Sequence, residues 1–123
     1  MASDGFDFEG LVRAGYPLER FEAGERIFVE GDEGSTMYVV RAGSVGIMSA
    51  GEVLETVRPG ETFGELSLID GAPRGATAVA REPTEVAVID EGAFNYLIER
   101  TPSFALDLMR RLSKRLRRMN ENI

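Results

Sequence analysis

Residues 63–78 read FGELSLIDGAPRGATA, a stretch of small residues around one arginine and an early glutamate. The guanidinium of Arg74 is a forked donor that can bind two phosphate oxygens at once. The carboxylate of Glu65 can accept a sugar hydroxyl, and Gly64 lacks the Cβ that would keep a ligand from the backbone. Ser67 lies in a segment that can form one helical turn, whose N–H groups would face an anion. The stretch therefore predicts a site for a small sugar phosphate.

On both sides of this stretch, residues 21–90 contain short apolar runs separated by glycines. Valine, isoleucine and aromatic residues dominate the runs and often alternate with polar residues, as in half-buried strands. The glycines between runs, Gly31 and Gly34 among them, are expected in turns that need a positive φ. Short strands with frequent turns predict an antiparallel β-roll or jelly roll. The predicted strands are Glu25–Glu30, Thr36–Ala42, Ser44–Ala50, Glu52–Arg58, Ala76–Arg81 and Thr84–Asp90.

The pattern becomes helical after Asp90, which suits the N-cap of a helix over Glu91–Arg100. Pro102 ends that helix and suits the first position of the next one. The second helix is expected from Ser103 to about Asn120, with apolar residues at steps of three and four. The sequence thus predicts one mainly β domain with helices. Its parts are an N-terminal arm or short helix over 1–20, a β-roll over 21–90 that holds the site at 63–77, and two helices over 91–123.

The chain of 123 residues contains neither cysteine nor histidine. These absences exclude disulfides, thiolate zinc sites, iron–sulfur clusters, His-ligated haem and any cysteine or histidine nucleophile. The acidic run EGDEG at 30–34 lacks the order of a calcium loop and is expected to be a solvated turn. We therefore expect no enzyme activity, no metal and no cofactor.

Charge and hydropathy limit the partners. No apolar run approaches the roughly 18 residues that span a bilayer, and MASDGFDFEG lacks the features of a signal peptide. We expect a cytoplasmic protein without membrane insertion. Residues 1–109 hold 8 basic and 20 acidic residues, whereas residues 110–123 hold 6 basic and 1 acidic. Because so acidic a body repels nucleic acid, no direct nucleic-acid binding is expected.

The spacing within the quoted stretch resembles the phosphate-binding cassette of the cyclic-nucleotide-binding domain family. Gly-Glu-Leu at 64–66 is followed by Pro73-Arg74 and then by Ala76-Thr77. Similar cassettes occur in protein kinase A regulatory subunits, cyclic-nucleotide-gated channels and catabolite activator proteins. The upstream runs FVEG at 28–31 and MYVV at 37–40 also agree with the family, as do the two trailing helices.

The resemblance implies a role for each residue of the cassette. Arg74 would bind the exocyclic phosphate oxygens and Glu65 the ribose 2′-hydroxyl. The hydroxyls of Ser67 and Thr77 are better interpreted as structural, although Thr77 belongs to the candidate set. Backbone N–H groups and apolar side chains would supply the remaining contacts. The candidate ligand-binding residues are Val57, Phe63, Gly64, Glu65, Leu66, Arg74, Gly75, Ala76 and Thr77.

The residue after Arg74 bears on the identity of the nucleotide. Family members that favour cGMP often have a threonine there, whose hydroxyl meets the guanine. This chain has Gly75 at that position. The resemblance therefore favours cAMP over cGMP.

The basic C-terminal helix has three interpretations. It can be an amphipathic helix whose Leu/Met stripe packs on the β-roll while its charges are solvated. It can be a lid, and the resemblance then implies that Arg115 lies near the purine and stacks on it while Met119 or Asn120 caps it. It can be a dimer seam, although the rhythm of Leu112, Leu116, Met119 and Ile123 covers under two heptads.

We expect a sensor in which binding of a cyclic nucleotide, cAMP or else cGMP, repositions the C-terminal helices. Two alternatives stay open. The chain can be the ligand-binding half of a catabolite-activator-like transcription regulator without its DNA-binding part. It can also be an interaction scaffold that keeps the fold and binds no ligand. The sequence names neither an effector protein nor an oligomeric state, and binding measurements with cAMP and cGMP separate the sensor from the scaffold.

Overall fold

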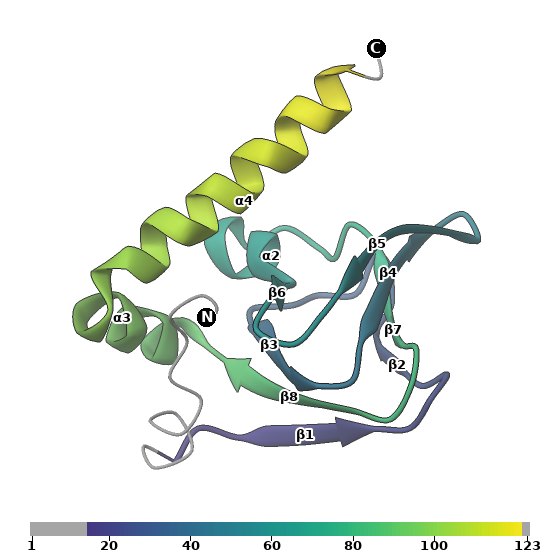
Figure 1. Ribbon diagram of the computed structural model, residues 1–123, viewed down its shortest axis with the longest axis horizontal. Coiled ribbons are helices and arrows are strands. Elements are labelled where there is room, and N and C mark those ends of the chain that lie inside the picture. Colours follow the sequence, from purple (N-terminus) through teal and green to yellow (C-terminus); the bar gives the residue numbers. More distant parts are fainter. Residues whose placement is uncertain (1–14, 122–123) are drawn as a thin grey trace.

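The computed structural model describes residues 15–121, with side chains as far as Arg118 (Figure 1). This part of the chain folds into eight strands and three helices. Helix α2 lies between two strands, and α3 and α4 follow the last strand. The strands are β1 (Leu18–Phe21), β2 (Arg26–Phe28), β3 (Met37–Ala42), β4 (Val45–Ser49), β5 (Glu52–Val57), β6 (Thr62–Phe63), β7 (Thr77–Ala80) and β8 (Thr84–Ile89). The helices are α2 (Glu65–Asp70), α3 (Glu91–Arg100) and α4 (Pro102–Glu121).

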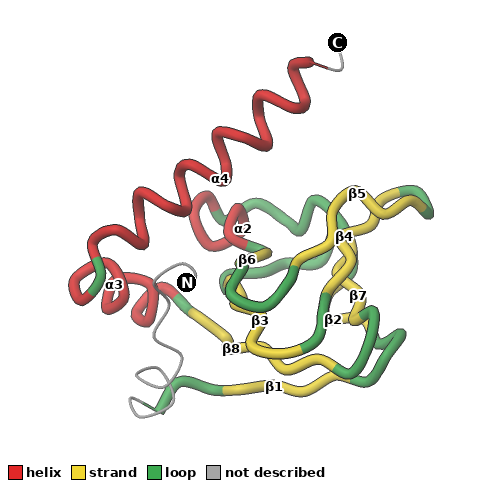
Figure 2. Tube along the Cα trace, in the orientation of Figure 1, coloured by secondary structure: helices red, strands yellow, loops and turns green. Residues whose placement is uncertain are grey.

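The strands form two antiparallel sheets of four (Figure 2). One sheet has the order β1-β8-β3-β6 and the other has the order β2-β7-β4-β5. In the second sheet Val45 of β4 pairs with Val57 of β5 on one side and with Ala80 of β7 on the other. The antiparallel β-roll predicted from the spacing of the apolar runs is confirmed.

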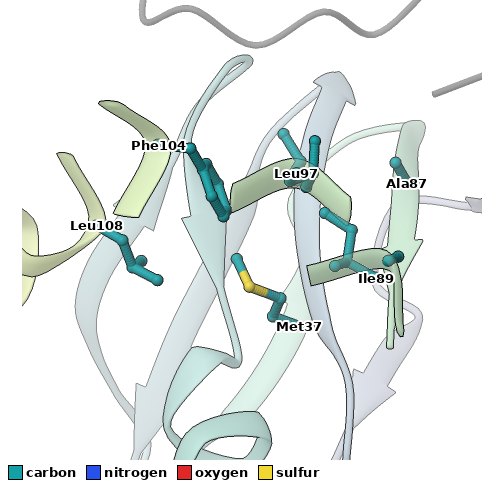
Figure 3. Packing of buried hydrophobic residues seen from close by; sticks show 8 residues of the cluster. Met37, Ala87, Ile89, Leu97, Phe104 and Leu108 are labelled. Atoms are coloured by element: carbon teal, nitrogen blue, oxygen red, sulfur yellow. The ribbon is translucent and has the colours of Figure 1, made fainter. Parts of the chain in front are cut away.

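Strand β3 separates two hydrophobic clusters, because successive side chains of a strand point to opposite faces. Tyr38 and Val40 lie between the sheets, in a cluster with residues of β4, β5 and β7. Met37 and Val39 point the other way, toward α3 and α4, and both are fully buried. Figure 3 shows this second cluster, in which Met37, Ala87, Ile89, Leu97, Phe104 and Leu108 pack together. A strand covered on both faces accounts for the continuous apolar run at 37–40.

Strands β2 to β5, β7 and β8 all lie within the ranges predicted from the sequence. The expectation of an arm or short helix over 1–20 is wrong for its last residues, because Leu18–Phe21 is an edge strand paired with β8. Residues 1–14 lie outside the described part of the chain. Strand β6, which has only two residues, was not predicted. The two residues of β6 are too few to show an alternating pattern, and the four residues of β1 show none because only the two end residues are partly buried. Both strands are defined by their partners instead.

The two C-terminal helices begin where their capping signals are. The side chain of Asp90 accepts the backbone N–H of Ala93 at 2.8 Å, so it is the N-cap of α3. Pro102 is the first residue of α4. No helix in the described residues is both long and apolar enough to cross a bilayer.

Helix α4 is attached to the body mainly by its first turns. Phe104 and Leu108 are buried, whereas Met109 and Leu116 are 57% and 59% exposed. From α3 the helix passes over α2, and its C-terminal half extends away from the sheets in the view of Figure 1. The interpretation of a Leu/Met stripe that packs on the β-roll is therefore wrong for Met109 and Leu116. The dimer seam stays a prediction.

Candidate ligand-binding site

The quoted stretch forms a tight connection from β6 through α2 to β7. Gly64 precedes α2 with φ of 78°, a left-handed conformation that strains residues with a Cβ. Helix α2 covers Glu65–Asp70 and ends at Gly71, whose N–H donates to the carbonyl of Ser67. The predicted helical turn around Ser67 is thus present. In the described chain no side chain caps the start of α2, so its first N–H groups remain available to a ligand.

Arg74 is a buried cation, with 5% of its surface exposed. Its Nη1 donates to the carbonyl of Gly64 at 3.0 Å, and its Nη2 donates to Oγ1 of Thr36 at 3.3 Å. The guanidinium carbon lies 4.1 Å from the centre of the Phe28 ring, a cation–π contact. Its Nε is buried and has no hydrogen-bond partner among the described residues. The guanidinium is therefore held in place while part of its donor capacity is unused.

The loop at 29–36 shapes the surroundings of Arg74. The Arg74 N–H donates to the carbonyl of Asp32 at 2.8 Å, and the Arg74 carbonyl accepts the N–H of Gly31 at 2.8 Å. A Cβ on Gly34 would lie 2.3 Å from Nε of Arg74. Gly34 does not have a positive φ, so the expectation of a left-handed turn there is wrong. A hydrogen is needed at this position because the guanidinium occupies the space.

Glu65 is a buried carboxylate, only 2% exposed, at the first position of α2. Its Oε1 accepts the Thr62 hydroxyl at 3.4 Å, and its Oε2 accepts Nη1 of Arg115 from α4 at 3.5 Å. Nη2 of Arg115 donates to Oε1 of Glu55 on β5 at the shorter distance of 2.9 Å. Both contacts to Glu65 are near the upper limit for a hydrogen bond, so this carboxylate can still accept from a ligand.

A pocket of about 490 Å³ lies above these groups, within the size range of small-molecule sites. Eight of the residues predicted to contact ligand or to form a lid lie in its wall. The predicted residues in the wall are Phe63, Gly64, Glu65, Leu66, Arg74, Gly75, Ala76 and Arg115. The side chains of Met119 and Asn120, the other lid candidates, lie outside the described residues.

Two predicted contacts are not part of the pocket wall. Val57 is 1% exposed and packs in the cluster between the sheets. The hydroxyl of Thr77 accepts the backbone N–H of Glu30 at 2.9 Å and so joins β7 to the loop after β2. The structure therefore does not bring Val57 and Thr77 into the pocket wall, and the Thr77 hydroxyl has a backbone contact of the kind that its structural interpretation expects.

The structure adds residues that sequence reasoning missed. Phe28 follows the pattern of β2, and nothing in the sequence indicates that its ring lies under a guanidinium. Glu55 belongs to an alternating strand, and only the fold brings it opposite Arg115. Ser67 was expected to be structural, yet it is in the pocket wall. The wall residues not predicted as contacts are Phe28, Ile47, Leu54, Glu55, Ser67 and Arg118.

The charged side chains in the wall are three arginines and two glutamates. Their formal sum is one positive charge, which suits a ligand with a single negative charge. The apolar part of the wall suits a flat ring, because aromatic and aliphatic side chains provide most of the contact area in such sites. The β-roll holds a buried guanidinium in the wall of a ligand-sized pocket, and helix α4 contributes to the same wall. These features define a domain that binds a small anion.

This chain belongs to the cyclic nucleotide-binding domain family, whose model matches residues 18–101. It is 37% identical over 102 residues to the cyclic AMP receptor protein of Thermus thermophilus, covering 79% of this chain and 47% of that protein. It is 36% identical over 80 residues to the cAMP-dependent protein kinase regulatory subunit of Yarrowia lipolytica, covering 65% of this chain and 21% of that protein. The chain thus spans half or less of the length of these relatives.

Comparison of structures agrees with the comparison of sequences. The crystal structure of the Thermus thermophilus catabolite activator protein matches with a TM-score of 0.78 and 34% identity. The match covers 94% of this chain and 58% of that one. The two-sheet roll and its trailing helices are therefore the fold of this family.

Proposed function

We propose that the chain is a sensor module that binds cAMP in the pocket above Arg74. The observation that carries the proposal is the buried guanidinium of Arg74, fixed by Gly64 and Thr36 with its Nε unpartnered among the described residues. An unsatisfied buried donor on a cation is costly, and a phosphate would satisfy it with a charge-assisted hydrogen bond. The net positive charge of the wall supports a monoanion.

The rest of the cassette matches the remaining parts of the ligand. The phosphate binds Arg74 and the backbone N–H groups of Gly75 and Ala76. The ribose 2′-hydroxyl donates to Glu65, whose two existing contacts are long. Gly75 in place of threonine supports adenine over guanine, as does the similarity to a cyclic AMP receptor protein. In this proposal cGMP binds more weakly.

Ligand binding repositions α4 through Arg115. This side chain contacts Glu65, the carboxylate assigned to the ribose, so ligand and helix share one acceptor. A ligand that changes the contact at Glu65 changes what holds the middle of α4. Because the helix is rigid along its length, the displacement is transmitted to its C-terminal end.

The proposed module regulates and does not catalyse. It acts in the cytoplasm without a metal, a cofactor, a membrane anchor or bound nucleic acid of its own, and it passes the signal to an effector protein. Such an effector would respond to the position of α4.

Isothermal titration of the chain with cAMP, cGMP and 5′-AMP tests the proposal. We expect cAMP to bind most tightly, because 5′-AMP carries a second phosphate charge at neutral pH and lacks the cyclic geometry. Absence of binding of either cyclic nucleotide below about millimolar concentration would contradict the sensor and favour a scaffold. Tighter binding of cGMP than of cAMP would keep the sensor and overturn the assignment of the base.

A second candidate is the ligand-binding half of a transcription regulator. The coverage of 47% of the cyclic AMP receptor protein favours it. It shares the same pocket chemistry and differs in its effector, which would be a DNA-binding part. A DNA-binding assay with the whole natural protein, with and without cAMP, distinguishes this candidate from a stand-alone module.

A further inference from the structure

Arg115 joins three elements that are distant in the sequence. It extends from α4, donates to Glu55 on β5 at 2.9 Å, and contacts Glu65 at the start of α2 at 3.5 Å. The side chains of Arg115 and Glu55 are 30% and 29% exposed, whereas that of Glu65 is 3% exposed. All three residues lie in the wall of the pocket. One guanidinium thus connects the helix with two walls of the site.

The carboxylates of Glu65 and Glu55 differ in the partners that they have besides Arg115. Glu65 already accepts from Thr62, and under the proposed function it also accepts the ribose hydroxyl. Glu55 has Arg115 as its sole ion-pair or side-chain hydrogen-bond partner in the described part of the chain. The contact of Arg115 with Glu55 is also shorter than its contact with Glu65. When ligand occupies Glu65, Glu55 is therefore the carboxylate that continues to hold Arg115.

One turn before Arg115, Arg111 donates to the carbonyl of Gly60 at 3.3 Å and to the Thr62 hydroxyl at 3.4 Å, and beyond that turn the attachments of α4 to the β-roll are few. The buried residues of the helix, Phe104 and Leu108, lie in its first turns, and Leu116 is 59% exposed. Within the described residues, the hydrogen bonds that join α4 to the β-roll beyond Leu112 are those of Arg115. The ion pair between Arg115 and Glu55 thus attaches α4 to β5 beside the pocket.

We propose that Glu55 is a positioning residue for bound nucleotide. It holds Arg115, and through it the middle of α4, against the ligand once the ribose has taken Glu65. The Nε of Arg115 is buried and without a partner in the described chain, so a guanidinium anchored through Nη2 still has a donor for a ligand atom. This inference rests on the proposed function and assigns a further residue to its site.

The role predicts a kinetic effect. A residue that holds α4 against bound ligand slows dissociation, whereas encounter depends on the open pocket. Because the ion pair is about one-third exposed, its effect is modest. We expect Glu55→Gln to raise the dissociation rate of cAMP about three- to fivefold and to leave the association rate within about twofold.

Stopped-flow displacement of a fluorescent cAMP analogue by unlabelled cAMP measures both rates. The matched control is Glu52→Gln, which removes an exposed carboxylate from the same strand outside the pocket wall and should match the parent chain. In an Arg115→Ala background, Glu55→Gln should have no further effect on dissociation. Thermal unfolding of each variant shows that the fold is intact.

Two results would overturn the inference while leaving the proposed function in place. The first is a parent chain that binds cAMP together with a Glu55→Gln variant of unchanged dissociation rate. The second is an equal acceleration by Glu55→Gln in the presence and absence of Arg115, which would show that Glu55 acts without it. A parent chain that binds no cyclic nucleotide would instead remove the proposed function, and this inference with it.

Discussion

Two arginine–glutamate clusters in this molecule have opposite compositions. On the β1-β8-β3-β6 sheet a single carboxylate, that of Glu85, accepts from Arg20 at 2.8 Å and from Arg41 at 2.6 Å. At the pocket a single guanidinium, that of Arg115, donates to two carboxylates at 2.9 and 3.5 Å. The first cluster has short contacts and joins three strands. The second has one long contact and a buried Nε without a partner among the described residues.

The Glu85 cluster is therefore structural, whereas the Arg115 cluster is suited to binding a ligand. The two arginines lower the pKa of Glu85, with the hydrogen bond from Arg20 as the largest cause and that from Arg41 as the next. That carboxylate has its partners already. Within the described residues, the pocket retains unpartnered donors on Arg74 and Arg115 and a carboxylate with long contacts. Unused hydrogen-bonding capacity thus gathers where the ligand is proposed to bind.

The largest effect is expected from Arg74→Ala, which removes the cation proposed for the phosphate. Hydrogen bonds to charged groups contribute about 2–3 kcal/mol, so cAMP affinity should fall roughly 30- to 150-fold. Isothermal titration measures the loss. The matched control is Arg58→Ala, an exposed arginine outside the pocket wall, which should bind like the parent. Equal affinity of Arg74→Ala and the parent would show that the buried guanidinium is structural, like the Glu85 cluster.

A smaller effect is expected from Glu65→Ala, which removes the acceptor proposed for the ribose. The loss should be about tenfold, which corresponds to one hydrogen bond to a charged group at the lower end of its range, about 1.5 kcal/mol. The parent should bind 2′-deoxy-cAMP about tenfold more weakly than cAMP, and the variant should bind the two alike. If the variant still discriminates between them, the hydroxyl binds elsewhere in the pocket.

Gly34→Ala tests the space around Arg74 without touching a charge. The added Cβ would lie 2.3 Å from Nε of Arg74, so the guanidinium must move. Overpacking of this kind costs about 1–3 kcal/mol, and we expect about a fivefold loss of cAMP affinity and a lower Tm. Gly92→Ala is the control, because its Cβ would make only an ordinary contact at 3.6 Å in α3. Unchanged affinity in Gly34→Ala would mean that the position of Arg74 has little influence on binding.

The smallest effect is expected from Glu85→Gln. Because the pKa of Glu85 is lowered in the folded state, its stabilisation is present above the unfolded pKa and is lost as pH falls through the folded one. Thermal unfolding between about pH 5 and 3 should therefore be less pH-dependent in the variant than in the parent. At neutral pH the loss should stay below about 1 kcal/mol, as for surface ion pairs. Binding of cAMP should be unchanged, and a clear loss would contradict the separation of the two clusters.

The strands and helices that could be predicted are those whose own residues show the apolar spacing or the capping signal. Short apolar runs between glycines marked six strands, and the Asp90 cap and Pro102 marked the two long helices. Strand β1 carries no such pattern, since only its two end residues, Leu18 and Phe21, are partly buried. Its pairing with β8 depends on residues more than sixty positions away, and no local window contains that information.

The candidate site likewise has residues that could be predicted from the sequence and residues that could not. Arg74, Glu65 and the small residues between them are close in the chain, and their spacing could be interpreted directly. Phe28 and Glu55 enter the pocket wall from other strands, so only the three-dimensional structure assigns them. Val57 was assigned to the site through the family resemblance, but the structure buries it in an interior outside the pocket wall. Here that interior is the space between the sheets.

In the proposed mechanism α4 acts as a lever whose last buried residue among those described, Leu108, is the fulcrum, while Arg111 and the half-buried Leu112 attach the helix less firmly one turn further on. At a rise of about 1.5 Å per residue, Arg115 lies roughly 10 Å from that fulcrum and Glu121 roughly 20 Å. A displacement of about 1 Å at Arg115 therefore becomes about 2 Å at the far end. A small displacement within the pocket thus produces its largest displacement at the last turns of the helix.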